Sequence, residues 1–428
     1  MSGGRMAVLV VCDSLRADLV DRETAPTLAR LREEATYFAD FRGVFPSTTR
    51  TSAASIATGC RPAAHGLLGN TMVLDEGQGL TCLSVGKPDF LDRLRRATGR
   101  ALGRPTLHQR VASLGPAVAM SNVSPGAAYV LDPEGAGFVY HRAGSFGPGR
   151  ARLDDGLAIE IGAEGDRAMT RRFCDEVIDA GQPPLSVLWL SEPDHTGHHA
   201  PLGSLEHRRA IAEADRNVAS VLARIEGQDP GGKRILVAVC SDHGMQTIRR
   251  VIDVDARLLE AGFKAAPDSR EVVVAPQGTA VIVHVAAGSR KRMPELVRWL
   301  EAQDFVGRVV TGAALAALGL PEHETLAIAV SLAGDDEPNA FGVRGRSDVA
   351  ENAFGGEYAP GNGQHGGLGP YEQRPFLALR GGGYGRARIE QPASLVDLAP
   401  TFLRHLGLEA DATQGCVLPG REPSSDRR

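Results

Sequence analysis

Three predominantly apolar runs restrict the fold more than any other feature of the chain. They lie at residues 6–11 (MAVLVV), 185–190 (LSVLWL) and 234–240 (RILVAVC). Runs of this length, rich in β-branched residues, are typical of strands buried on both faces of a parallel sheet. Helical spacing of apolar residues separates them at 26–35, where Thr24 is a candidate N-cap, and at 166–180 and 205–225. We therefore predict an α/β three-layer sandwich with a mostly parallel central sheet.

The pattern changes between residues 251 and 359. Short antiparallel strands are expected at 272–274 and 279–285, a helix at 292–302 and a short helix at 309–318. We interpret 251–359 as an inserted α+β cap subdomain, with a catalytic core formed by residues 1–250 and 360–410. Residues 411–428 are polar, and we expect them to form a disordered tail.

Each apolar run ends in acidic or histidine residues. Asp13 follows the first run, and Asp242 and His243 follow the third. The second run leads into SEPDHTGHH, which holds Glu192, Asp194 and His198, and a further histidine, His365, lies in the glycine-rich turn GNGQHGG. Ligands of open α/β sheets bind beyond the carboxyl ends of the strands, so we expect these side chains to converge at one edge.

Mixed aspartate and histidine ligands suit borderline metals such as Zn²⁺. The chain offers enough of them for two ions, and two metals can clamp an in-line phosphoryl displacement. Each residue has an ordinary alternative, because a single aspartate at a strand end is more often a turn former. Only the conjunction of several clusters makes a metal centre the better interpretation.

Residues 45–70 (FPSTTRTSAASIATGCRPAAHGLLGN) combine a hydroxyl cluster with a small-residue helix expected at 52–58. The N–H groups and the positive dipole at a helix start attract anions, so a hydroxyl there is well placed to attack phosphorus. The alternative is that Ser47, Thr48, Thr49 and Thr51 only cap the helix, which is what such residues usually do.

Composition narrows the class of protein. The chain has 428 residues, a formal net charge of −5 and 43% hydrophobic residues, so a large core is available and a nucleic-acid-coating role is not indicated. Six scattered cysteines give weak evidence for disulfides. No stretch resembles a signal peptide or a membrane span. We therefore expect a soluble cytoplasmic protein without nucleic-acid or membrane partners, whose oligomeric state stays open.

Five motifs together resemble the alkaline phosphatase superfamily, and most nearly its nucleotide pyrophosphatase/phosphodiesterase branch. They are VLVVCDSLRAD, FPSTTRTSAASIATGCRPAAHGLLGN, EPDHTGH, SDHGM and QHGG. They occur in the family's order across residues 6–250 and 360–407. The resemblance implies the superfamily's fold and a small phosphorylated substrate, with nucleotides among the candidates.

The resemblance also implies roles for individual residues. Thr49 is the expected nucleophile, which becomes transiently phosphorylated, and Asn70 the expected donor to a non-bridging phosphate oxygen. Two Zn²⁺ ions are the implied cofactors, with Mn²⁺ or another divalent ion as alternatives. One ion would be held by Asp13, Thr49, Asp242 and His243, and the other by Asp194, His198 and His365.

The chain departs from the family directly after the nucleophile. Phosphodiesterases of this kind usually have an aromatic residue there, whereas this chain has Arg50. Arg50 either contacts a second charged group of the substrate or faces solvent. The favoured function is hydrolysis of phosphoesters or phosphoanhydrides as a phosphodiesterase or nucleotide pyrophosphatase. Alternatives are a C–P hydrolase resembling phosphonoacetate hydrolase, a phosphomonoesterase and a non-catalytic metal-binding module.

Overall fold

A ten-stranded, mostly parallel sheet forms the centre of the computed structural model, which describes residues 4–322, 324–355 and 358–420. Strand β1 pairs in parallel with β10 on one side and β11 on the other. Antiparallel strands occur only towards the edges of this described sheet. Its order is β21 (Ala387–Ile389), β2 (Thr36–Phe38), β20 (Leu377–Arg380), β11 (Ile235–Cys240), β1 (Met6–Cys12), β10 (Leu185–Leu190), β6 (Val118–Ser121), β7 (Phe138–Tyr140), β8 (Phe146–Gly147) and β9 (Ala151–Arg152).

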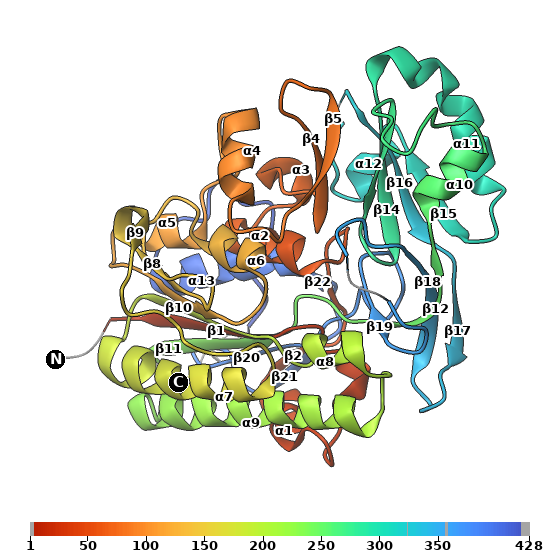
Figure 1. Ribbon diagram of the computed structural model, residues 1–428. Coiled ribbons are helices and arrows are strands. Elements are labelled where there is room, and N and C mark those ends of the chain that lie inside the picture. The colour runs from red at the N-terminus through yellow and green to blue at the C-terminus, as the bar shows by residue number, and fades with distance from the viewer. Residues whose placement is uncertain (1–3, 323, 356–357, 421–428) are drawn as a thin grey trace.

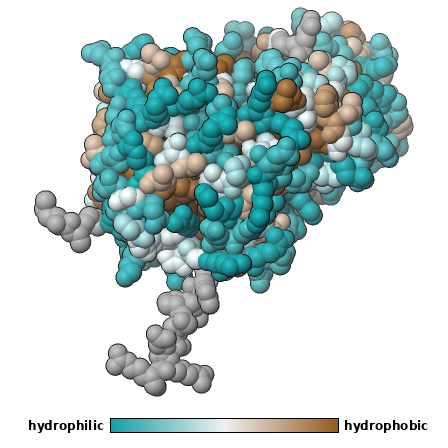
Figure 2. All heavy atoms as spheres, turned by 90° about the horizontal axis from the view of Figure 1, so that it is seen from below, coloured by the Kyte–Doolittle hydropathy of each residue, from teal (hydrophilic) through white to brown (hydrophobic). Residues whose placement is uncertain are grey.

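Alternation along β1 divides the core into two apolar layers. Val8 and Val10 pack into the layer that contains α1 (Pro26–Glu34), α7 (Ala163–Arg172) and α9 (Leu205–Gln228). Ala7 and Leu9 pack into the opposite layer, with α2 (Thr49–Thr58), α4 (Phe90–Thr98), α5 (Leu107–Val111), α6 (Pro125–Ala128) and α13 (Leu398–Leu406). Helices therefore cover both faces of the sheet (Figure 1), and the predicted three-layer sandwich is confirmed. The outer face of the α1, α7 and α9 layer is mostly hydrophilic (Figure 2).

The N-terminus of α1 differs from its prediction. No side chain of its own segment caps the helix, and the hydroxyl of Thr24 instead accepts a hydrogen bond from Arg208. The backbone N–H groups of Thr27 and Leu28 donate to the buried carboxylate of Asp215 on α9, over 3.2 and 2.7 Å. A residue remote in sequence therefore satisfies the free N–H groups of this helix.

Residues 251–359, called the cap segment below, contain a four-stranded antiparallel sheet with its own apolar cluster. Its strands are β13 (Val272–Pro276), β14 (Ala280–Val285), β16 (Leu326–Leu332) and β15 (Val306–Thr311), accompanied by α10 (Val254–Glu260), α11 (Met293–Glu301) and α12 (Ala314–Ala317). The helix predicted at 309–318 is wrong over its first half, because Val309 to Thr311 pair with β16. That the cap segment is a separate subdomain stays a prediction.

Two smaller sheets join the cap segment to the rest of the chain. The hairpin of β4 (Thr71–Asp75) and β5 (Leu80–Ser84) shares an apolar cluster with β13 and β14. A second sheet has the order β17 (Gly334–Pro338), β18 (Arg344–Ala350), β12 (Gln246–Ile252) and β19 (Gly363–Gln364). The short helix α3 (Pro62–His65) follows α2, and the short strands β3 (Phe41–Arg42) and β22 (Ala393–Ser394) pair with each other. Among the described residues, no helix has the length and apolar character needed to cross a bilayer.

The described part of the expected tail is held against the core. The N–H of Leu418 donates to the Thr401 hydroxyl on α13, and the N–H of Gln414 donates to the carbonyl of Gly59 at the end of α2. Leu418 is also buried. The predicted disorder is therefore wrong for residues 411–420, because both polar and apolar groups find partners there. Residues 421–428 lie outside the described part of the chain.

Candidate active site

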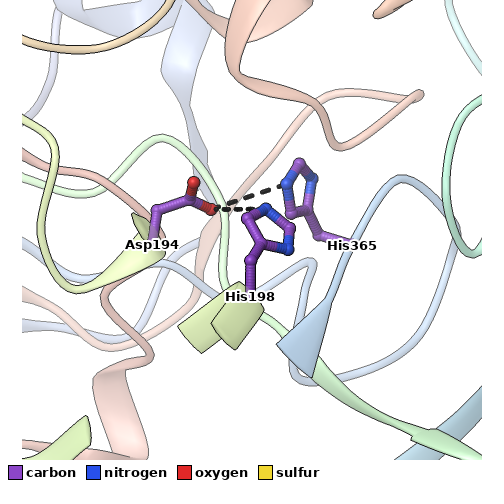
Figure 3. A group of neighbouring side chains, drawn as sticks. All are labelled: Asp194, His198 and His365. Atoms are coloured by element: carbon purple, nitrogen blue, oxygen red, sulfur yellow. Dashed lines mark ion pairs between the residues drawn. The ribbon is translucent and has the colours of Figure 1, made fainter. Parts of the chain in front are cut away.

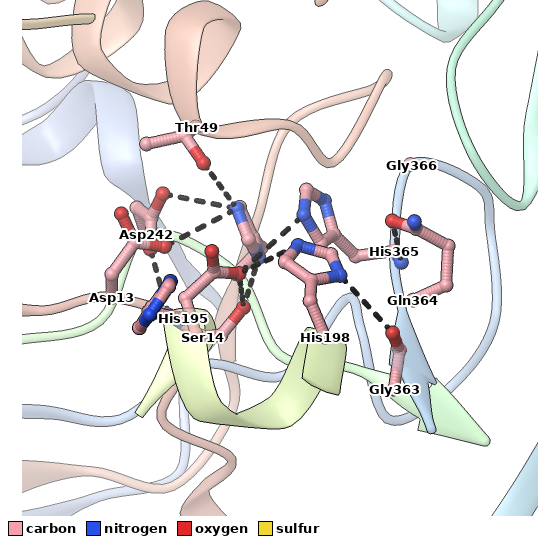
Figure 4. Close-up of polar contacts among 12 residues, drawn as sticks. Asp13, Ser14, Thr49, His195, His198, Asp242, Gly363, Gln364, His365 and Gly366 are labelled. Atoms are coloured by element: carbon pink, nitrogen blue, oxygen red, sulfur yellow. Dashed lines mark hydrogen bonds and ion pairs between the residues drawn. The ribbon is translucent and has the colours of Figure 1, made fainter. Parts of the chain in front are cut away.

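The ends of β1 and β11 bring together a buried group that we call the strand-end cluster: Asp13, Asp242 and His243. The Nε2 atom of His243 lies 3.1 Å from Asp242 Oδ2 and 3.7 Å from Asp13 Oδ1. The same nitrogen is 3.1 Å from the hydroxyl oxygen of Thr49. Figure 4 shows Asp13, Asp242 and Thr49 close to one another. The convergence expected from parallel strand ends is present.

Two carboxylate oxygens of this cluster have no hydrogen-bond partner in the structure although both are buried: Asp13 Oδ1 and Asp242 Oδ2. Their other oxygens do have partners, since Trp189 Nε1 donates to Asp13 and the N–H of Ser14 donates to Asp242. Burial raises the pKa of Asp13 well above its ordinary value, and the carboxylates of Asp242 and Asp194 raise it further. A divalent cation would satisfy both orphaned oxygens and relieve the repulsion, so this donor set fits a metal ion.

A second group, called the helix–loop cluster, consists of Asp194, His198 and His365. Asp194 and His198 lie on one face of the short helix α8 (Asp194–His199), and His365 follows β19. Asp194 Oδ1 is 3.3 Å from His198 Nε2 and 3.5 Å from His365 Nε2 (Figure 3). One carboxylate oxygen and two imidazole nitrogens therefore face a common point, as in a metal site with mixed N and O ligands.

Backbone carbonyls orient both histidines of the helix–loop cluster. Nδ1 of His198 is 3.1 Å from the carbonyl oxygen of Gly363, and Nδ1 of His365 is 2.8 Å from that of Ser47. A carbonyl can only accept, so both Nδ1 atoms must carry a proton. In the neutral imidazoles Nε2 then has a free lone pair, which is the arrangement that metal-binding histidines use.

The hydroxyl of Ser14 connects the two clusters. It donates to Asp194 Oδ1 over 2.7 Å and lies 3.0 Å from His243 Nδ1. Ser14 has a φ of 60°, which is unusual for a residue other than glycine. The rings of His243 and His365 also stack with their centroids 3.8 Å apart. Sequence reasoning missed Ser14, since neither its backbone conformation nor its remote partners leave a motif.

Thr49 is the first residue of α2, as the nucleophile interpretation requires. The alternative that the nearby hydroxyls cap this helix is wrong, because no side-chain cap hydrogen bond is present there. Thr48 and Thr51 instead pair with each other, 2.9 Å between their hydroxyl oxygens. Ser47 donates to the carboxylate of Glu372. The Thr49 hydroxyl is thus left facing His243.

Glu372, a second residue that sequence reasoning missed, fixes the turn that carries His365. Its buried carboxylate accepts five hydrogen bonds between 2.6 and 3.0 Å. The donors are the hydroxyls of Ser47 and Thr279 and the N–H groups of Gly366, Gly367 and Gly369. The start of α2, the cap segment and the histidine turn are tied together through one side chain.

Three further residues of the SEPDHTGHH segment, Glu192, His195 and His199, lie outside both clusters. The carboxylate of Glu192 accepts from the N–H and hydroxyl of Thr196, so it braces α8, and burial raises its pKa to about 7. His199 hydrogen-bonds through Nδ1 to the carbonyl of His195, and the two rings lie against each other. Glu192 therefore does not join the ligand candidates with which its sequence position grouped it.

Arg50 and Asn70 line one polar cavity of about 210 Å³. Gln364, the residue before His365, lines it as well, which places the cavity beside the helix–loop cluster. The N–H of Asn70 donates to Gln277 Oε1 over 2.7 Å, while Asn70 Oδ1 is buried without a hydrogen-bond partner. The two residues predicted to bind substrate are thus in the same cavity.

Residues 7–323 match the sequence model of the family described as type I phosphodiesterase/nucleotide pyrophosphatase. The chain belongs to this family. Membership of the type I phosphodiesterase/nucleotide pyrophosphatase family supports a hydrolase of phosphoester bonds and confirms the resemblance to the alkaline phosphatase superfamily. A search of curated proteins finds no match.

Solved structures of the family share the fold. Murine ectonucleotide pyrophosphatase/phosphodiesterase 5 has a TM-score of 0.67 at 16% identity, covering 98% of both chains. An inactive variant of that mouse protein in complex with AMP has a TM-score of 0.66, again at 16% identity and 98% coverage of both chains. The human protein has a TM-score of 0.68 at 15% identity, covering 96% of this chain and 97% of its own. These likenesses establish the alkaline phosphatase-type α/β architecture.

Proposed function

We propose that the chain is a two-cation phosphodiesterase or nucleotide pyrophosphatase in which Thr49 is the nucleophile. The observation that carries this proposal is the position of the Thr49 hydroxyl. It lies at the start of a ten-residue helix and 3.1 Å from Nε2 of His243, beside two orphaned carboxylate oxygens. A helix start attracts the phosphate, and the buried donor set accommodates positive charge next to the hydroxyl.

The donor sets support two divalent cations, of which Zn²⁺ suits mixed aspartate and histidine ligands best. Asp13, Asp242 and His243, together with the Thr49 oxygen, would hold one ion, and Asp194, His198 and His365 would hold the other. When bound, such ions act as Lewis acids that lower the pKa of a hydroxyl and offset charge on phosphate oxygens.

The chain's own residues account for the remaining steps of a double displacement. The Thr49 oxygen attacks phosphorus in line and gives up its proton to solvent, while the alcohol or phosphate on the opposite side leaves and takes up a proton from solvent, so that Thr49 carries the phosphoryl group. Water then attacks phosphorus, gives one proton back to the departing Thr49 oxygen and leaves its hydroxyl group on the released phosphate. The side chain of Asn70, in the adjoining cavity, donates to a non-bridging oxygen as charge develops there.

The test is a substrate panel with purified protein and Zn²⁺. We expect a phosphodiester to give a higher kcat/KM than a phosphomonoester or phosphonoacetate, and Thr49→Ala to abolish turnover while both ions stay bound. A preference above tenfold for the monoester would indicate a phosphomonoesterase, and for phosphonoacetate a C–P hydrolase. Two bound ions without turnover of any compound would favour a non-catalytic module.

The substrate class is also part of the proposal. A small phosphorylated compound suits the cavity of about 210 Å³ beside Thr49. A nucleotide is one candidate, since the mouse relative is found in complex with AMP. We also propose a cytoplasmic location, which fractionation of cells expressing the chain would test.

A further inference from the structure

The cavity beside Thr49 is bounded by parts of the chain that lie far apart in sequence. It lies between the start of α2, the β4–β5 hairpin, the turn after β13 and four residues of the later chain, Asn352, Phe354, Tyr358 and Gln364. The lining side chains that bear on a ligand are Arg50, Lys87, Asn70, Asn352, Tyr358 and Gln364. The charges of Asp194 and Asp13 act on Arg50, so the cavity that Arg50 lines lies near both clusters.

The charged side chains that line this cavity are all positive among the described residues. Arg50 and Lys87 are cationic, and none of the described lining residues is an aspartate or glutamate. Burial lowers the pKa of Arg50 to about 10, so its guanidinium remains charged at neutral pH. Within the described chain, its hydrogen bond is to the Ser124 hydroxyl, over 3.0 Å, and it forms no ion pair with a carboxylate.

Two other partly buried arginines, unlike Arg50, form ion pairs with a carboxylate. Arg249 and Arg250 both pair with the fully buried carboxylate of Asp348, as the usual compensation for charge removed from water requires. Arg50 has no carboxylate within ion-pair distance among the described residues, and the charges of Asp194 and Asp13 act on it only from farther away. The backbone at Gly86 lies so close that a Cβ there would be 2.6 Å from Arg50 Nη2.

The remaining groups of the lining can donate hydrogen bonds. Burial raises the pKa of Tyr358 to about 12, against the opposing effect of the Arg50 charge, so its hydroxyl keeps its proton at neutral pH. The side-chain amides of Asn70, Asn352 and Gln364 add N–H donors. A pocket of two cations and several neutral donors is complementary to an anion with several acceptor oxygens.

From these observations we infer that the cavity binds a second anionic group of the substrate through Arg50 and Lys87. This inference rests on the proposed function and deepens it. The substrate is then a small phosphoryl compound that carries an additional carboxylate or phosphate next to the reacting phosphorus. A compound whose only anionic group is the reacting phosphoryl group leaves Arg50 without a directly paired anion among the groups that the structure describes.

The experiment compares two p-nitrophenyl phosphodiesters that differ in one group. In one the second ester substituent carries a carboxylate, and in the other the same carboxylate is masked as its methyl ester. A third compound carries a terminal phosphate in place of the carboxylate. It shows whether the cavity prefers a second phosphate or a carboxylate. For the Zn²⁺-loaded protein we expect the better of the two anionic compounds, the carboxylate or the phosphate, to have a kcat/KM about 10- to 100-fold above that of the methyl ester.

Substitutions assign that preference to the cavity. Arg50→Gln should reduce the ratio between the anionic and masked compounds to within threefold of one, Lys87→Gln should reduce it less, and Arg50→Lys should keep part of it. Arg216→Gln on α9 is the matched control, since that exposed arginine pairs with Glu213 away from the site. It should leave the ratio unchanged. Thermal unfolding of each variant verifies that the fold is retained.

A binding measurement separates this inference from the proposed function. Calorimetric titration of the Thr49→Ala protein with the same compounds needs no turnover, so the preference is measurable even if hydrolysis fails. Equal binding of the anionic and masked compounds overturns the inference. So does a preference that survives in Arg50→Gln, or tighter binding of a neutral nucleoside ester than of either anionic compound.

Discussion

The two metal-type clusters differ in what holds them. The strand-end cluster sits on the carboxyl ends of the central strands β1 and β11, and its side chains are at most 1% exposed. The helix–loop cluster sits on the six-residue helix α8 and on the turn after β19, and His198 and Asp194 are 25% and 18% exposed. The first is part of the core, whereas the second is assembled on its rim.

This difference suggests a division of labour within the proposed active site. In the proposed centre, the buried carboxylates with orphaned oxygens would bind a cation tightly and position Thr49 against it. Ligands on a short helix and a turn depend on outer contacts such as the carbonyls of Gly363 and Ser47 and the carboxylate of Glu372. The helix–loop cluster should therefore be the more sensitive to changes in residues that never touch a metal.

The largest effect is expected from Asp242→Asn in the strand-end cluster. The substitution keeps the shape but removes the negative charge of a buried ligand, so one cation should be lost and kcat/KM should fall by well over about 100-fold, more than outer contacts alone account for. Metal content by mass spectrometry, alongside diester hydrolysis, measures both. Full retention of both ions would contradict the ligand role of Asp242.

His365→Ala should act on the helix–loop cluster alone. We expect one of two cations to be lost selectively, since His365 Nε2 faces Asp194 and not the strand-end carboxylates. His199→Ala is the matched control, because that exposed histidine lies on α8 outside both clusters. Metal analysis that shows two tightly bound ions in His365→Ala would remove His365 from the ligand set.

Ser14→Ala tests whether the two clusters are coupled. Loss of its hydroxyl removes contacts to Asp194 and His243 together, and we expect cation affinity to fall by about 10- to 100-fold at both sites. Ser14→Gly removes the same hydroxyl but suits the positive φ, so it should lose affinity equally and unfold at a higher temperature than Ser14→Ala. Competition with a chelating dye measures the affinities. Unchanged affinity in both variants would leave Ser14 without a positioning role.

The smallest expected effect is a decrease in the free energy of unfolding on acidification, in the region around the helix–loop cluster. His207, at the start of α9, is buried, and burial together with the charge of Arg16 lowers its pKa to about 4. A lowered folded-state pKa gives stability that is present above the unfolded value of about 6.5 and lost as pH falls towards 4. Between pH 7 and 5 this loss amounts to about 2 kcal/mol for His207.

Hydrogen exchange across α8 and the start of α9 measures this loss. Protection there should fall more steeply on acidification than in β1 and β11. His207→Gln should flatten the difference, because that side chain cannot take up the proton. Equal pH dependence of the two regions in the unsubstituted protein would contradict the contrast between rim and core.

The sequence predicts well whatever a local pattern encodes. The run MAVLVV becomes β1, and Asp13 and Asp242 meet because parallel strand ends share one edge of the sheet. The prediction fails where a residue remote in sequence determines the local structure. Val309 and Val310 form a strand because β16 lies beside them, and the N-terminus of α1 is capped by Asp215 rather than Thr24.

The same distinction applies to the candidate site. All seven predicted ligand positions gather in the structure, because each follows an apolar run or lies in a motif. Ser14 and Glu372 escaped prediction, since their partners lie up to 325 positions away and their own surroundings show no pattern. Lys87 and Tyr358 line the cavity for the same reason: chain topology, not local sequence, brings them to Arg50.

The hydrogen bond from His365 to the carbonyl of Ser47 joins positions 318 residues apart. On the ribosome, every strand-end ligand has been synthesised by the time His243 is added, while the last histidine of the rim is still far from translation. In the proposed enzyme, a growing chain therefore completes the ligand set of its first cation well before that of its second. Completion of that proposed two-cation centre is deferred until His365 has emerged.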